Sequence, residues 1–326
     1  MKKPPLIILT GPTAVGKTAL SIRLAKAVGG EILSADSMQV YKGMDIGSAK
    51  IRPDEMEGVS HHLIDILEPW EEFHVVRFQE CAKACIQEIY GRGHIPILTG
   101  GTGFYIQAVL YDIDFTQNGQ DGAYRRHLEA LAAEKGPAYL HGLLEAVDPE
   151  AAKQIHENNI KRTIRALEYY QETGEPISGH NERERQKESP YNFAYFVLNQ
   201  DRARLYERID RRVDAMLEAG LVDEVKALKE AGCTRDMVSM QGLGYKEILD
   251  YLDGRIDYEE AVRVLKRDTR HFAKRQLTWF RRERDVTWIE REAFENDEER
   301  ILDFMKDALK EKGICPPVLR EHRQGV

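Results

Sequence analysis

Near its start the chain reads Gly11-Pro12-Thr13-Ala14-Val15-Gly16-Lys17-Thr18, which fits the pattern G-x-x-x-x-G-K-[ST] at every specified position. The apolar run Leu6–Leu9 precedes it without alternation, which predicts a strand buried on both faces of a parallel sheet. The segment Thr18–Val28 follows with apolar residues at helical spacing. A strand, a glycine-containing turn and a helix in this order predict a phosphate-binding loop in an α/β fold.

The residue types of this loop suit a polyphosphate group. Glycines let the backbone curl so that successive N–H groups point into one concavity, and the following helix adds partial positive charge at its start. We expect the Lys17 ammonium to reach the phosphates and the Thr18 hydroxyl to bind a magnesium ion, Mg2+. The pattern does not by itself indicate hydrolysis, since a typical phosphate-loop ATPase also needs a carboxylate at the end of another strand. Asp36, at the end of the next predicted strand, is one well-placed carboxylate.

Further apolar runs alternate with helical patterns, which predicts βαβ units and a doubly wound parallel sheet. The expected strands after the first are 31–35, 62–66, 95–98, 193–198 and 286–289, and a helix is expected over 75–90.

The alternation stops at a turn-rich linker, 117–122, after which helical periodicity continues to about Gly174. We therefore predict an all-helical insertion, 115–190, within a phosphate-loop core made of 1–114 and 191–326 with a helical C-terminal region. The charge run Arg183–Lys187 has balanced signs and predicts a solvated linker.

The composition narrows the class of protein. The chain has 326 residues, a formal net charge of −8 and four scattered cysteines, so it is neither a basic protein as a whole nor a disulfide scaffold. Its apolar runs fall far short of a membrane span and its start shows no signal peptide, so we expect a cytoplasmic protein with no membrane contact. The segment Arg263–Arg284 is locally basic, with nine Lys or Arg against two acids. Interleaved aromatic residues make it a candidate RNA-binding surface.

Several motifs in order resemble those of the bacterial tRNA dimethylallyltransferases, also called tRNA isopentenyltransferases. They are the loop at 11–18, the segment Ser34–Lys50, Gly100–Tyr105, Lys161–Glu168, Gln241–Tyr245 and Thr269–Arg281. The resemblance runs from about Leu6 to Trp288 and implies a prenyltransferase with a phosphate-loop α/β fold. It implies transfer of a dimethylallyl group from dimethylallyl diphosphate to the exocyclic N6 amine of the adenosine 3′-adjacent to the anticodon, with release of pyrophosphate. It also implies a monomer that binds the anticodon stem-loop.

The resemblance assigns the reacting groups. Residues 11–18 would bind the diphosphate, and Lys17 and Arg212 would stabilise the charge of the leaving group. Asp36 would act as the base, and a water-mediated magnesium ligand is the less favoured alternative for this residue. Thr102 would contact the target nucleotide beside Asp36.

The resemblance also implies a tRNA interface, because the base must leave its stack to react. The residues expected there, besides Asp36 and Thr102, are Ser37, Met38, Gln39, Tyr124, Lys161, Arg162, Thr163, Ile164, Arg165, Gln241, Gly244, Tyr245, Lys246, Lys274, Arg275 and Gln276.

Three other functions fit part of the sequence. A phosphate-loop kinase for a small molecule would explain the loop and Asp36 but not the helical insertion. A prenyltransferase acting on free adenine nucleotides would not need a long basic surface. A non-catalytic RNA-binding protein would have no need for Lys17, Thr18 and Asp36 together.

Overall fold

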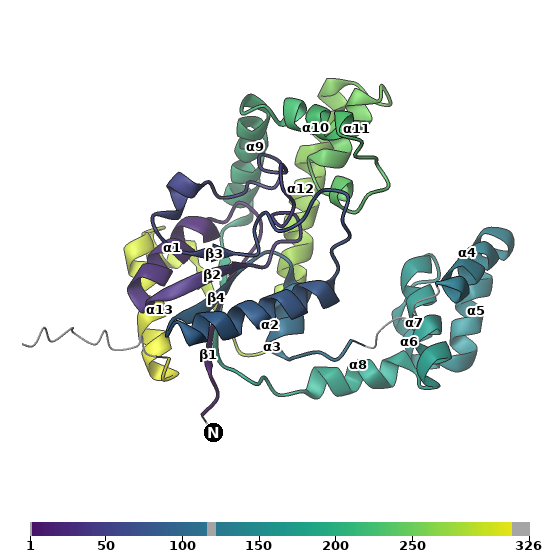
Figure 1. Ribbon diagram of the computed structural model, residues 1–326, viewed down its shortest axis with the longest axis horizontal. Coiled ribbons are helices and arrows are strands. Elements are labelled where there is room, and N and C mark those ends of the chain that lie inside the picture. Colours follow the sequence, from purple (N-terminus) through teal and green to yellow (C-terminus); the bar gives the residue numbers. More distant parts are fainter. Residues whose placement is uncertain (1, 116–121, 315–326) are drawn as a thin grey trace, which may run out of the picture. The chain divides into compact units, whose positions relative to one another are not determined.

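We describe residues 2–115 and 122–314 of a computed structural model (Figure 1). Most of the predicted linker, 117–121, lies outside this range. The chain divides into two compact units, one formed by the residues up to Leu110 together with those from Pro190 onward, and the other by Tyr111–Ser189. No helix among the described residues is long and apolar enough to cross a membrane.

A six-stranded sheet forms the first unit, with the strand order β3-β2-β4-β1-β5-β6 and parallel pairing throughout. Its strands are β1 Pro5–Thr10, β2 Gly30–Ser34, β3 His61–His62, β4 Ile95–Gly100, β5 Asn192–Asn199 and β6 Val286–Glu290. Parallel order with helical crossovers confirms the predicted α/β class.

The predicted strand over 62–66 is wrong for most of its length. Only His61–His62 pair as β3, because Leu63 and Asp65 take positive φ angles of 62° and 54°. An extended strand needs negative φ, so the backbone turns away from the sheet after His62.

Helices cover both faces of this sheet. The helices of this unit are α1 Lys17–Val28, α2 Val75–Gly91, α3 Gly103–Leu110, α9 Arg202–Glu218, α10 Leu221–Glu230, α11 Tyr245–Leu252, α12 Tyr258–Phe280 and α13 Glu298–Glu311. Of these, α10 and α11 pack on α9, α12 and each other, away from the sheet (Figure 1). Short 3₁₀ turns lie at Pro53–Met56, Ser239–Gln241 and Arg291–Phe294.

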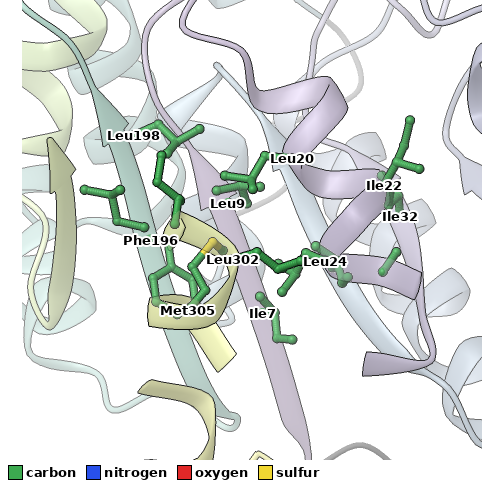
Figure 2. Close-up of a cluster of buried hydrophobic side chains, with 14 of the residues drawn as sticks. Ile7, Leu9, Leu20, Ile22, Leu24, Ile32, Phe196, Leu198, Leu302 and Met305 are labelled. Atoms are coloured by element: carbon green, nitrogen blue, oxygen red, sulfur yellow. The ribbon is translucent and has the colours of Figure 1, made fainter. Parts of the chain in front are cut away.

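The core follows from the alternation of side chains along each buried strand. Ile7 and Leu9 of β1 face a cluster that α1 and α13 complete through Leu24 and Met305, as Figure 2 shows. Their neighbours in β1 point to the opposite face, and α2 packs on β2 and β4. The apolar run in β1 has no polar side because both faces of the sheet are covered.

The second unit is all helical in its described part, with α4 Ala123–Lys135, α5 Pro137–Val147, α6 Pro149–Gln154, α7 Ile160–Thr173 and α8 Ile177–Gln186. It has its own core around Leu140, Leu144 and Leu167. The prediction of a linker at Arg183–Lys187 was wrong, because α8 runs to Gln186. Arg183 pairs with Glu175 at 2.7 Å, and oppositely charged neighbours along α8 support an exposed helix that has no buried residue.

Candidate active site at the carboxyl end of the sheet

A cavity of about 360 Å³ opens where β1, β2 and β4 end. In an open parallel sheet this edge is the usual place for a ligand. The residues that line the cavity are Thr13, Ala14, Gly16, Lys17, Thr18, Ser34, Asp36, Gln39, Ser48, Ala49, Thr99, Gly100, Gly101, Arg208, Arg211, Arg212, Phe272 and Gln276. It thus collects the phosphate loop, Asp36, Gln39, Arg212 and Gln276 from the predicted residues.

The phosphate loop has the backbone that its glycines predicted. Gly16 lies at φ 98°, and Ala14 is also left-handed at φ 63°. A non-glycine residue in this region costs on the order of 1 kcal/mol, which identifies the loop as a conformation held by its surroundings. Within the loop, Gly11, Pro12 and Val15 are buried, and the other five residues line the cavity.

Lys17 lies folded onto its own loop. Its Nζ donates hydrogen bonds to the carbonyl oxygens of Gly11 and Pro12, both at 2.9 Å. Burial, together with repulsion from the nearby Arg212, lowers the pKa of Lys17 to about 7, against the opposing effect of Asp36. An anion bound beside this desolvated ammonium group would strongly stabilise its charged form.

Helix α9 adds three arginines to the cavity. Arg208, Arg211 and Arg212 are spaced i, i+3, i+4 and therefore share one face of the helix. Burial lowers the pKa of Arg212, and burial together with repulsion from Arg291 lowers that of Arg208. Only Arg212 was singled out from the sequence, although the same helical spacing could have indicated the other two.

Asp36 lies on a turn that is fixed by backbone hydrogen bonds. Its Oδ1 accepts a hydrogen bond from the Met38 N–H at 2.9 Å. The Ala35 N–H donates to Thr99 at 2.7 Å, and the Thr102 N–H donates to the Ala35 carbonyl at 3.2 Å. Thr102 thus lies beside the Asp36 turn through its backbone. Gly100 is required there, since a Cβ would overlap the Ala35 carbonyl.

The amide of Gln39 faces the cavity but is held within the chain. Ser34 Oγ donates to its Oε1 at 2.9 Å, and its Nε2 lies 3.4 Å from the carbonyl oxygen of Ala49. The amide therefore links the end of β2 to the loop 45–50, which supplies Ser48 and Ala49 to the cavity.

The loop 45–50 is anchored from α10 by one carboxylate. Glu224 accepts hydrogen bonds from three consecutive N–H groups, those of Asp45, Ile46 and Gly47, at 3.0, 2.7 and 3.1 Å. The Tyr245 hydroxyl donates to the same carboxylate at 2.8 Å. No pattern in the sequence pointed to Glu224.

Tyr245 was predicted to contact tRNA, but its side chain is fully buried and a Cβ at Gly47 would overlap its ring. Thr163 and Ile164 are likewise in the core of the helical unit, with exposed fractions of 0% and 2%. Since a buried side chain cannot meet RNA without unfolding, the structure gives these three residues packing roles.

Other predicted tRNA residues of the first unit lie on its surface or near it. Lys274 and Arg275 are exposed on α12, and Gln241 is exposed with its amide donating to the Arg235 carbonyl. Ser37, Met38 and Lys246 are half-buried, with Met38 close against Gly242, while Gly244 is buried at φ 93°.

The basic segment 263–284 is less free than its charge count indicated. The chain's own acids pair with Arg263, Lys266, Arg267 and Arg270. The exposed Lys274 and Arg275 mark the part of α12 best placed to meet a phosphate backbone.

In the helical unit, Lys161 and Arg162 are exposed in the first turn of α7, Arg165 is half-buried, and Tyr124 is exposed on α4. The neighbouring Arg125 is bidentate to Glu168 at 2.8 and 2.6 Å. The exposed cations Lys161 and Arg162 therefore remain the candidates here for a contact with an anion.

The fold and the site together define a phosphate-loop α/β protein whose cation-lined cavity is built for a polyphosphate next to a carboxylate. The family model described as IPP transferase matches residues 39–283, and that of isopentenyl transferase matches residues 4–68. A tRNA dimethylallyltransferase of Lachnoclostridium phytofermentans is 64% identical over 95% of this chain and 99% of its own length.

Solved structures with similar folds point to the same family. The tRNA isopentenylpyrophosphate transferase of Bacillus halodurans has 47% identity and a TM-score of 0.72, covering 96% of this chain and 99% of its own. A eukaryotic dimethylallyltransferase acting on tRNA has 29% identity and a TM-score of 0.81, covering 98% and 81%. The chain belongs to the tRNA dimethylallyltransferase family.

Proposed function

We propose that this enzyme transfers the dimethylallyl group of dimethylallyl diphosphate to the N6 amine of the adenosine 3′-adjacent to the anticodon in tRNA, releasing pyrophosphate. The observation that carries the proposal is the cavity that brings the phosphate loop, three arginines and Asp36 together in a chain of this family. The family match favours this transfer over a small-molecule kinase and over prenylation of free adenine nucleotides.

The reaction needs a base because the amine lone pair of adenine is delocalised into its ring. In our proposal the N6 nitrogen attacks the first carbon of the dimethylallyl group, and its proton passes to the Asp36 carboxylate. The carbon–oxygen bond to the diphosphate breaks, and its electron pair leaves with the pyrophosphate. Thr102, whose backbone is bonded to the Asp36 turn, would contact the incoming nucleotide.

The leaving group is stabilised by cations and by backbone dipoles. Pyrophosphate gathers negative charge as the bond breaks, and the loop amides, Lys17 and Arg212 meet that charge in a half-buried cavity. Arg208 and Arg211 line the same cavity and add to its potential. Lys17 exchanges its bonds to Gly11 and Pro12 for phosphate oxygens and becomes fully protonated there.

A magnesium ion fits the donors present. Mg2+ favours hard oxygen ligands and is often held by one or two side chains together with substrate phosphates. Thr18 offers a hydroxyl at the start of α1, Asp36 lies in the same cavity, and the diphosphate supplies the other oxygens. Such an ion would neutralise diphosphate charge when bound.

The tRNA side of the proposal rests on residues at the surface. Ser37, Met38 and Gln39 would line the space of the flipped base. Lys274, Arg275, Lys161 and Arg162 would neutralise phosphates, and the exposed Tyr124 and Gln241 and the half-buried Arg165 and Lys246 would add further contacts with tRNA. We further propose that the enzyme acts as a monomer.

The direct test incubates the purified chain with tRNA, Mg2+ and dimethylallyl diphosphate, followed by mass analysis of the nucleosides. We expect adenosine to gain the mass of one dimethylallyl group. Parallel reactions with free adenosine monophosphate, and with ATP plus tRNA, should give no such product. Consumption of ATP with the prenyl donor left intact would overturn the proposal.

A further inference from the structure

Gln276 lies between the phosphate loop, here also called the donor loop, and the turn that carries Asp36. It is only 5% exposed. It comes from α12, whose residues Phe272, Gln276 and Trp279 form one stripe at i, i+4, i+7 spacing. Phe272 lines the cavity, and Trp279 lies against Gly103, where a Cβ would overlap its ring. The exposed Lys274 and Thr278 belong to the other side of the same helix, and the exposed Arg275 lies over the ring of Phe272 at 5.7 Å.

The amide of Gln276 joins two backbone segments. Its Oε1 accepts a hydrogen bond from the Thr13 N–H at 2.9 Å, and its Nε2 donates to the Gly101 carbonyl at 3.0 Å. The first partner can only donate and the second can only accept, so the amide fits one way round. Thr13 belongs to the phosphate loop, and Gly101 to the turn after β4.

That second segment leads directly to the base. The turn containing Gly101 continues to Thr102, whose N–H donates to the Ala35 carbonyl at 3.2 Å, next to Asp36. A path of three hydrogen bonds therefore runs from the phosphate loop through Gln276 and the turn 101–102 to the backbone of Ala35, the residue before Asp36. A shift of about 1 Å between two reacting groups can cost 100-fold in rate, so a fixed spacing here matters.

We propose that Gln276 is a positioning residue for the donor loop, which it holds at a set distance from the Asp36 turn. It does so from inside the protein and does not contact tRNA, contrary to the expectation from the sequence. This inference rests on the proposed function. It adds that the amide acts on the diphosphate side of the reaction, while its neighbours Lys274 and Arg275 act on the acceptor side.

The test uses the full-length chain and two variants of this position. Gln276→Leu keeps the size of the side chain but leaves the Thr13 N–H and the Gly101 carbonyl without their partner. Gln276→Glu keeps an acceptor for Thr13, and it regains a donor for Gly101 only when its carboxyl is protonated. Thr278→Ala, two residues along on the exposed side, is the matched control.

The first measurement is the Kd of pyrophosphate with Mg2+, by calorimetry, together with the melting temperature. We expect Gln276→Leu to bind about tenfold more weakly, the effect of losing roughly one well-made buried hydrogen bond. Thr278→Ala should match the wild type. For Gln276→Glu, the ratio of its Kd to that of the wild type should shrink as pH falls from 8 to 5, because burial favours the protonated acid and that form restores both bonds.

The second measurement separates donor from acceptor in steady-state kinetics. Gln276→Leu should raise KM for the prenyl donor and lower kcat, with KM for tRNA unchanged within twofold. Unchanged pyrophosphate binding, or a rise confined to KM for tRNA, would overturn the inference in favour of direct tRNA contact. A wild-type enzyme that neither bound pyrophosphate nor transferred the prenyl group would instead refute the proposed function itself.

Discussion

Strand β2 has a carboxylate near each end, and the two carboxylates have different surroundings. Glu31, at the amino end, is held by three side chains, with Arg92 at 2.9 and 2.8 Å and His62 and His94 each at 2.6 Å. Asp36, just past the carboxyl end, accepts a backbone N–H from Met38 and lies in a cavity with Lys17 and Arg212.

The surroundings of these two carboxylates show that one end of the strand serves stability and the other serves chemistry. Glu31 meets its cations inside the chain, and bonding to Arg92 and the two histidines lowers its pKa to about 2 against the opposing effect of burial. The cations near Asp36 instead surround a space large enough for a ligand. The charges at the amino end are thus satisfied on folding, and those at the carboxyl end upon binding substrate.

Asp36→Asn should have the largest effect on the reaction. The amide keeps the size and the hydrogen bond from Met38 but cannot take a proton from the amine, so kcat should fall by about 10²- to 10⁴-fold. Affinities for pyrophosphate and tRNA should stay within a few-fold. Single-turnover prenyl transfer with separate binding titrations measures this. A defect reversed by raising Mg2+ would assign Asp36 to the magnesium shell and not to the base.

Lys17→Met should have the next largest effect. Loss of one preorganised cation at the leaving group should lower kcat/KM by about 10²- to 10³-fold. The free enzyme has a Lys17 pKa of about 7, and a bound diphosphate raises it. Wild-type binding of pyrophosphate at pH 8 should therefore take up a proton that Lys17→Met does not, as calorimetry in two buffers would detect. At pH 6 the lysine is already charged, and the difference should nearly vanish.

Glu224→Gln tests a residue that supports the cavity from outside it. The neutral amide has one acceptor oxygen where the carboxylate has two, so part of the bonding to the 45–47 backbone and to Tyr245 is lost. We expect kcat/KM of Glu224→Gln to fall about tenfold, which corresponds to a loss of roughly 1.4 kcal/mol. In Tyr245→Phe, kcat/KM should fall less. Steady-state kinetics with both variants checks this order. Equal activity in Glu224→Gln and the wild type would show that the loop 45–50 needs no such anchor.

These residues also show which parts of the site could be predicted from the sequence and which could not. The loop at 11–18 and Asp36 could be found because each belongs to a short local pattern next to a buried strand. Glu224 could not, since a glutamate in an amphipathic helix is ordinarily a surface charge and its partners lie some 178 positions earlier in the chain. For Gln276 the sequence motif was recognised, but the direction in which its side chain points was not. Only the packing of α12 shows which of its residues face inward.

Glu31→Gln should leave the reaction unchanged and affect folding alone, which sharpens the contrast between the ends of β2. Its carboxyl has a pKa of about 2 in the folded chain, below its ordinary value of 4.5. A depressed acid pKa stabilises the folded state above pH 4.5, and that stabilisation is lost as pH falls from 4.5 toward 2. Because the side chain is buried, we expect the amide to cost about 1–3 kcal/mol in unfolding free energy at pH 7.

Urea unfolding of the wild type and Glu31→Gln at pH 7 and at pH 3.5 measures this, with KM and kcat as controls. The gap between the two proteins should be widest at pH 7 and narrower at pH 3.5, where the wild-type carboxyl has begun to lose its advantage over the unfolded chain. A fall in kcat without a change in stability would mean that the amino end of β2 is tied to the chemistry after all. The separation of roles along the strand would then have to be abandoned, since one end could not be altered without the other.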